Sequence, residues 1–234
     1  MAYEYHTTPQ QVEVARLSRR LLSKLECEGS GKRIVVGISG VPGSGKTTLA
    51  RSVCTYVNTI YSKIHSTTST VAVDLPMDGF HFTRQRLASM PDPETAIHRR
   101  GAAFTFDAEG FYRLVQDLTT TPIKTVWAPS FDHATKDPVD SAIKIPIEAV
   151  VVLVEGNYCA LDREPWKQSA SLMDELWFID TPPDVAHKRL AARHLISGIV
   201  ADEKEAWERA TGTDELNAQD IRENRLPCAE ILAL

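Results

Sequence analysis

The residues best suited to chemistry lie in one short segment, residues 40–48, which reads GVPGSGKTT. Glycines let the backbone curl so that successive N–H groups point at an anion. A helix that starts directly afterwards adds its free amides and the positive end of its dipole. This spacing of glycines, lysine and threonine predicts a loop that binds the phosphates of a nucleoside triphosphate. The residues expected to line it are Gly40, Val41, Pro42, Gly43, Ser44, Gly45, Lys46, Thr47 and Thr48.

Two side chains of this phosphate loop have expected roles of their own. Lys46 is expected to reach the β- and γ-phosphates, and the Thr47 hydroxyl to ligate Mg²⁺. A chance match to the motif occurs in roughly one chain in a hundred of this length. The β-branched run before the loop and the helical pattern after it make chance a still poorer explanation, so the sequence predicts binding of a nucleoside triphosphate.

The elements that must position this loop follow from the apolar periodicity. Strands are predicted at residues 34–38, 70–75, 123–127, 143–147, 149–154 and 175–179. Helices are predicted at residues 9–26, 45–60, 107–118, 164–172, 183–197, 202–211 and 215–224, and an apolar tail covers 229–234. This alternation predicts an α/β fold with a doubly wound, mainly parallel sheet flanked by helices.

Polar residues follow three of the predicted strands: Asp74 and Asp78 after one, Asp132 and His133 after another, and Glu155 after a third. Ligands of open parallel sheets bind at the carboxyl ends of the strands, so these residues are expected to surround one crevice with the phosphate loop. Glu155 occupies the place where enzymes with a phosphate loop of this kind carry the acid that supports Mg²⁺. A plain surface glutamate at a strand end is the alternative.

Asp78 is a candidate general base that orients an acceptor hydroxyl and takes its proton. The residues alone leave an even choice, because Asp-Gly is also a common turn pair. Asp74 is the other candidate base. Arg189 and Arg193 are four residues apart, so both project from one face of a helix and can clamp a phosphoryl group. A solvated helix face is the alternative for this pair.

Taken in order, the segments GVPGSGKTT, MDGFH, RRGAAFTFD, APSFDHATKDPV, VLVEGNY and RLAARH resemble one family of P-loop kinases, from about residue 32 onward. It is the family of uridine kinases, phosphoribulokinases and bacterial-type pantothenate kinases, and DGFH is most similar to its nucleoside- or sugar-kinase-like branch. The resemblance implies a P-loop kinase fold, ATP and Mg²⁺, Asp78 as base, Glu155 at the metal, and lid arginines at positions 189 and 193. It also implies that the substrate-side loops supply His81, Arg100, Asp107, Asp132, His133 and Asn157.

The chain departs from the uridine-kinase pattern in two places, which leaves the acceptor open. It has DGFH where those enzymes usually carry Asp-x-Phe-Tyr, and TFDAEGF in place of an FDHP-like stretch. Asp107 is equally well explained as a helix cap. Asn157 and Tyr158 are expected at the mouth of the site, and the four tryptophans are expected to be packing residues. Uridine or cytidine is the first expected acceptor, and pantothenate or a free sugar is the competitor. A regulatory NTPase switch is the alternative of another class.

The composition and charge of the chain limit the number of domains and the kinds of partner that we expect. Of 234 residues, 43% are hydrophobic and 24% charged, which suits one packed domain over residues 1–234, with a helical lead-in (1–31) and a helical lid (about 183–212). Basic residues are dispersed and the net charge is −5, which argues against nucleic-acid binding. The apolar runs are too short for a membrane span, no signal peptide is evident, and the four cysteines form no C-x-x-C pair. The expected protein is cytoplasmic and acts on a small molecule, and homo-oligomerisation stays open.

Overall fold

Five parallel strands form the central sheet of the computed structural model, which describes residues 8–28, 31–132, 134–198 and 200–233. Their spatial order is β2, β5, β1, β6, β7. In that order the bounds are Ala72–Pro76, Val151–Glu155, Ile34–Gly40, Glu175–Ile179 and Glu230–Leu232. Strands β1 and β5 are buried along their whole length, because a parallel sheet covered on both faces must be apolar on both.

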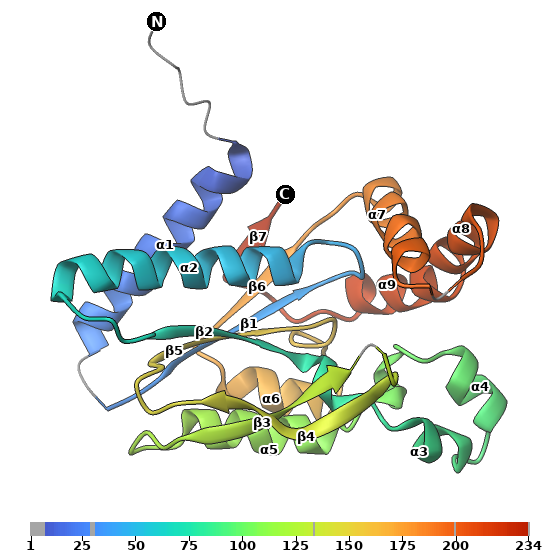
Figure 1. Ribbon diagram of the computed structural model, residues 1–234, viewed down its shortest axis with the longest axis horizontal. Helices are drawn as coiled ribbons and strands as arrows, with labels where there is room; N and C mark the ends of the chain where they lie inside the picture. Colours follow the sequence, from blue (N-terminus) through green and yellow to red (C-terminus); the bar gives the residue numbers. More distant parts are fainter. Residues whose placement is uncertain (1–7, 29–30, 133, 199, 234) are drawn as a thin grey trace, which may run out of the picture.

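Helices cover both faces of this sheet, α1 and α2 on one side and α5 and α6 on the other (Figure 1). Along β1 the side chains alternate between the two cores: Val35 packs on the α5 and α6 side, whereas Ile34 and Val36 pack on the α1 and α2 side. The predicted doubly wound α/β fold is therefore confirmed. The bounds of these helices are Pro9–Glu28 (α1), Lys46–His65 (α2), Ala108–Thr119 (α5) and Trp166–Leu172 (α6).

The remaining helices gather on the side of the molecule where β1 and β2 end (Figure 1). They are α3 (Arg84–Ala88), α4 (Pro93–His98), α7 (Pro183–Ile196), α8 (Glu203–Thr211) and α9 (Thr213–Glu223), with short 3₁₀ turns η1 (Met77–Phe80) and η2 (Ala103–Thr105). Every predicted helix is present, with ends that differ by a few residues. Within the described ranges no helix combines the length and apolarity that crossing a membrane requires.

Two strands that were expected in the main sheet form a small sheet of their own. Strands β3 (Val126–Asp132) and β4 (Asp137–Ile145) pair with each other in an antiparallel two-stranded sheet. The connection between them is short, and a short connection permits only antiparallel pairing, whereas a parallel neighbour needs a long crossover. The expectation that Asp132 ends a strand of the main sheet was therefore wrong.

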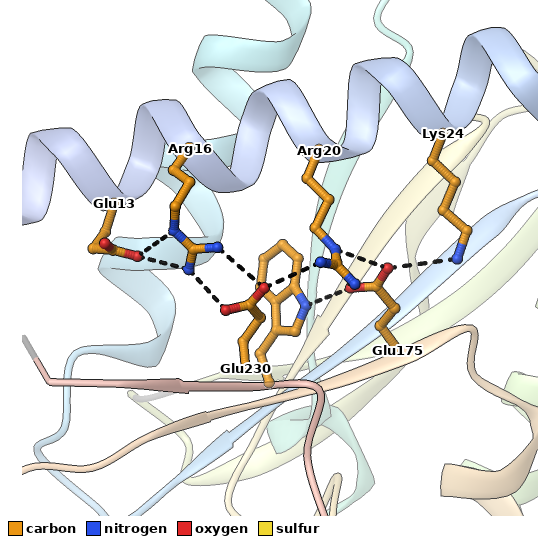
Figure 2. A network of polar contacts seen from close by, with 7 residues as sticks. Glu13, Arg16, Arg20, Lys24, Glu175 and Glu230 are labelled. Carbon is orange, nitrogen blue, oxygen red and sulfur yellow. Dashed lines mark hydrogen bonds and ion pairs between the residues drawn. The ribbon is translucent and has the colours of Figure 1, made fainter.

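The predicted apolar tail contains the edge strand β7, which pairs in parallel with β6. Helix α1 is attached to these two strands by a chain of ion pairs (Figure 2). Arg16 binds Glu13 and Glu230 at 2.8 Å, and Arg20 continues the chain to Glu230 at 3.3 Å and to Glu175 at 3.0 Å. The network ties the first described helix to the last described strand.

Candidate active site

The phosphate loop connects the end of β1 to the start of α2, as the sequence predicts. Its turn requires glycine, because Gly43 and Gly45 have φ values of 78° and 93°. Lys46 folds back into the loop, where its Nζ donates hydrogen bonds to the carbonyl oxygens of Gly40 (2.8 Å) and Val41 (3.0 Å). The Ser44 hydroxyl is buried without a partner among the described residues. The loop thus holds a cation and an unsatisfied hydroxyl in a cradle of the kind that binds phosphate.

Burial lowers the pKa of Lys46 to about 8, while the carboxylates of Glu155 and Asp78 act in the opposite direction. The side chain is only 8% exposed. A buried ammonium without a full counter-charge is costly, so an anion in the loop would stabilise its protonated form. The electrostatics of the loop therefore favour binding of an anion.

Thr47 and Glu155 meet directly, because the Thr47 hydroxyl donates to Glu155 Oε1 at 2.8 Å. Burial raises the pKa of Glu155, and Lys46 partly offsets this. In the described part of the chain no three His, Cys, Asp or Glu side chains form a metal cluster. One hydroxyl and one carboxylate beside a phosphate loop fit Mg²⁺, which takes its other ligands from phosphate and water.

The segment that carries Asp78 is held in place by the close approach of two glycines to their neighbours. A Cβ atom on Gly79 would lie 2.1 Å from the carbonyl oxygen of Pro129 in β3, and one on Gly156 would lie 2.4 Å from Met77 Cβ. Only glycine lets η1 fit so tightly between the β3–β4 sheet and the end of β5. The packing fixes the backbone at Asp78, which lines a cleft of about 490 Å³ together with Lys46 and Glu155.

Next to Asp78 the cleft has an aromatic lining. The His81 ring lies 4.0 Å from the Phe106 ring and 4.8 Å from the Phe131 ring, measured between centroids. Its Nδ1 lies 2.8 Å from the carbonyl oxygen of Asp78. The Arg100 guanidinium lies 5.4 Å over the Phe131 ring and donates to the carbonyl oxygen of Phe82. These side chains give the cleft a second compartment beside the phosphate loop.

Helix α7 packs directly on the phosphate loop, since a Cβ atom on Gly43 would lie 2.7 Å from the carbonyl oxygen of Ala186. Arg189 and Arg193 both line the cleft, which places this predicted pair on one face. Arg189 Nη1 would lie 3.9 Å from a Cβ atom on Gly45, and the charge of Arg193 lowers the pKa of Lys46. The cleft therefore gathers three cations around the loop.

Several other predicted residues lie elsewhere. Asp107 caps α5, accepting a hydrogen bond from the Gly110 amide at 2.8 Å, and Asp132 accepts one from the Ala134 amide at 2.8 Å. Neither lines the cleft, whereas Asn157 does. Asp74 pairs with Arg51 at 3.5 Å instead of lining the cleft. His133 is outside the described residues.

Tyr158 was wrongly expected at the mouth of the site. It is fully buried, and its hydroxyl donates to the carbonyl oxygen of Gly101 at 2.7 Å. Phe106 and Trp166 pack against its ring. Tyr158 comes shortly after β5, so this hydrogen bond joins the end of β5 to the segment that carries Arg100.

Four polar residues that line the cleft were missed from the sequence: His194, Arg209, Asp214 and Asn217. They come from α7, α8 and α9. The spacing of Asp214 and Asn217 places them on one helix face, which was the available signal. Nothing local indicated which way that face points.

Comparison with known proteins assigns the family. Residues 35–196 match the model of the phosphoribulokinase/uridine kinase family. The chain belongs to this family. It is 54% identical over 159 residues (67% of this chain, 92% of the relative) to the ATP-dependent kinase-like protein notR' of Aspergillus versicolor. It is 37% identical over 193 residues (82% and 80%) to a Schizosaccharomyces pombe protein provisionally named uridine kinase C227.14.

A solved structure supports the same family. A protein from Silicibacter sp. TM1040, provisionally named a fructose transport system kinase, is 32% identical, with a TM-score of 0.79. The superposition covers 94% of this chain and 98% of that one. As a member of the phosphoribulokinase/uridine kinase family, the protein is an ATP-dependent P-loop kinase. The family match includes Asp78 and Glu155 but ends before Arg209, Asp214 and Asn217.

Proposed function

We propose that the protein transfers the γ-phosphoryl group of ATP to a hydroxyl of a small metabolite. The observation that carries this proposal is a single cleft with two unlike halves. One half is the phosphate loop with Lys46, and the other is the compartment of Asp78, His81 and the two phenylalanines. A protein that only hydrolyses a nucleotide as a switch has no need of the second compartment.

In this proposal Asp78 orients the acceptor hydroxyl and takes its proton. The acceptor oxygen forms a bond to the γ-phosphorus while the bond to the bridging oxygen of ADP breaks, and ADP leaves with that electron pair. Lys46, Arg189 and Arg193 stabilise the charge that develops on the phosphoryl oxygens. Mg²⁺ bound at Thr47 and Glu155 would offset phosphate charge.

We further propose that residues 183–212 act as a lid within one catalytic domain. This segment contains α7, which contacts the phosphate loop, and α8, which supplies Arg209 to the cleft. Closing over bound ATP would exclude water and limit idle hydrolysis. The two arginines of α7 would reach the phosphoryl group in that closed state.

The relatives carry names that refer to different acceptors, uridine in one case and a fructose system in another. Uridine or cytidine is the first acceptor to test, and pantothenate or a free sugar is the competitor. The deciding experiment measures ADP release from MgATP with each of these compounds. We expect one compound to accelerate ADP release well above the basal rate. Steady basal hydrolysis that no acceptor stimulates would favour the switch function instead.

A further inference from the structure

The wall of the cleft that faces Arg100 is made of polar residues from three helices, which we call the polar wall. Its members are His194, Arg209, Asp214 and Asn217. The wall faces the Arg100 segment directly: Arg99 Nη2 donates to Asn217 Oδ1 at 3.1 Å, and Asn217 Nδ2 would lie 3.6 Å from a Cβ atom on Gly101. The polar wall and Arg100 therefore enclose the same part of the cleft.

His194 is a buried cleft residue with one nitrogen unused. Its Nε2 lies 2.7 Å from Asp214 Oδ2, and the two residues are only 4% and 9% exposed. Because a carboxylate only accepts, Nε2 carries the hydrogen and the ring is fixed in orientation. Nδ1 is buried and has no partner within the described chain. A buried ring nitrogen without a partner costs free energy, which a bound ligand can recover.

Two arginines of the same region also have unused donors. The Nε atoms of Arg100 and Arg209 are buried and unpartnered in the described part of the protein. Phe131 and the Phe82 carbonyl hold the Arg100 guanidinium in one plane, and Asp137 lies 3.5 Å from it. Guanidinium groups held this way match the paired oxygens of a carboxylate or a phosphate.

These cations are additional to those of the phosphate loop. Lys46, Arg189 and Arg193 surround the loop itself, where the triphosphate is expected. Arg100 belongs to the compartment of His81 and Phe131, and Arg209 belongs to the polar wall. Arg100 has Asp137 as a partial counter-charge at 3.5 Å, but the Nε donors of Arg100 and Arg209 are both unpartnered among the described residues. An anion is the ligand that satisfies such guanidinium donors best.

We propose that the acceptor carries an anionic group, a carboxylate or a phosphate, in addition to the hydroxyl that is phosphorylated. Arg100 and Arg209 bind this group through their guanidinium donors, and His194, held by Asp214, forms the adjacent part of the polar wall. The inference rests on the proposed function of the cleft. Among the acceptors considered above, pantothenate has such a group, whereas uridine and free sugars do not.

The test uses matched pairs of acceptors that differ in charge: pantothenate and panthenol, fructose 6-phosphate and fructose, glycerate and glycerol, uridine monophosphate and uridine. Carboxylates and phosphates thereby form separate arms. ADP release and the melting temperature of the nucleotide-free protein are measured with each compound. We expect one anionic member to exceed its neutral partner by about tenfold or more in kcat/KM, the value of a charged hydrogen bond.

Variants connect this preference to the polar wall. Arg209→Gln is expected to raise the KM for the anionic acceptor about tenfold or more and to remove its effect on the melting temperature, with the KM for ATP changed less than about twofold. Arg113→Gln is the matched control, because Arg113 is an exposed arginine of α5 outside the cleft. Its kinetics should match the wild type.

Each other outcome has a distinct meaning. Preferred turnover of a neutral compound, with a KM that Arg209→Gln leaves unchanged, would overturn the anionic acceptor while kinase activity stands. An Arg209-dependent rise in melting temperature without turnover would support the anion site and count against the proposed reaction. If no anionic compound raises the melting temperature or the rate, the inference is wrong.

Discussion

Lys46 is the residue whose charge depends most on what occupies the cleft. Burial holds its pKa near 8 without a ligand, compared with an ordinary value of 10.5. A triphosphate beside it favours the ammonium form and raises the pKa again. Above about pH 8 the free protein therefore lacks a proton that the complex holds, so binding must take one up. Below that pH both states are protonated.

We therefore expect nucleotide binding to take up roughly half a proton or more at about pH 8.5, and close to none at about pH 7. Calorimetric titration with MgADP in buffers of different ionisation enthalpy measures this number at each pH. Equal proton uptake at the two pH values would contradict the charge state assigned to Lys46.

Single residues near the loop were predictable because their signal is local. Gly45, Lys46 and Thr47 act through spacing along one strand-loop-helix unit. Glu155 ends β5, and Asp78 comes two residues after the end of β2. His194 and Arg209 were not predictable in this way. Their place in the cleft depends on how α7, α8 and α9 pack together, for example through the His194–Asp214 contact, and no short motif encodes that packing.

At the scale of elements, the Tyr158 hydroxyl connects the end of β5 to the loop that carries Arg100. Tyr158→Phe removes that hydrogen bond from the half-buried Gly101 carbonyl. We expect a loss of about 1–3 kcal/mol in the free energy of unfolding, measured by denaturant titration. The KM for the acceptor should rise, because the Arg100 loop is less well held.

Tyr112→Phe is the matched control for this substitution. The Tyr112 hydroxyl only accepts a hydrogen bond from Gln116 on the exposed face of α5. Removal of the Tyr112 hydroxyl should change the free energy of unfolding by less than about 0.5 kcal/mol. Equal effects of the two substitutions would show that the bond to Gly101 has no special role.

Elements were predicted well where the apolar pattern was strong, as in the periodicity of α5 and the unbroken apolar run of β5. The β3–β4 sheet was misplaced because a single strand pattern does not reveal its partner, and the segment after residue 127 is too polar to look like a strand. Strand β7 has three residues, too few for any periodicity. Its pairing with β6 depends on contacts distant in sequence, which only the folded chain brings together.

For the whole molecule, the network of Figure 2 determines how firmly α1 is attached to the sheet. Glu175 has a side chain only 8% exposed and accepts from Arg20 and from Trp177 Nε1. Glu175→Gln leaves the network with excess positive charge, so we expect a loss on the order of 1–2 kcal/mol in the free energy of unfolding. High salt should reduce the difference from the wild type.

Glu208→Gln serves as the control for Glu175, because Glu208 is exposed and pairs with Lys204 only at 3.8 Å. Its effect should be below about 0.5 kcal/mol. The network also has a pH signature: hydrogen bonding to Arg16 lowers the pKa of Glu230. Its stabilisation is therefore present above the ordinary pKa of 4.5 and is lost as the pH falls through the lowered value. Equal stability of Glu175→Gln and Glu208→Gln would contradict the stabilising role assigned to the network.

In the proposed reaction Asp78 faces the acceptor across the phosphate loop, and phosphoryl transfer by an Asp78 variant tests this role. Transfer of label from γ-labelled ATP to the best acceptor is compared for the wild type, Asp78→Asn and the control Asp74→Asn. We expect Asp78→Asn to lose transfer by about 100-fold to 10,000-fold while ATP binding is retained. Asp74→Asn, which alters a carboxylate outside the cleft, should keep most of its activity. Wild-type transfer by Asp78→Asn would contradict the account.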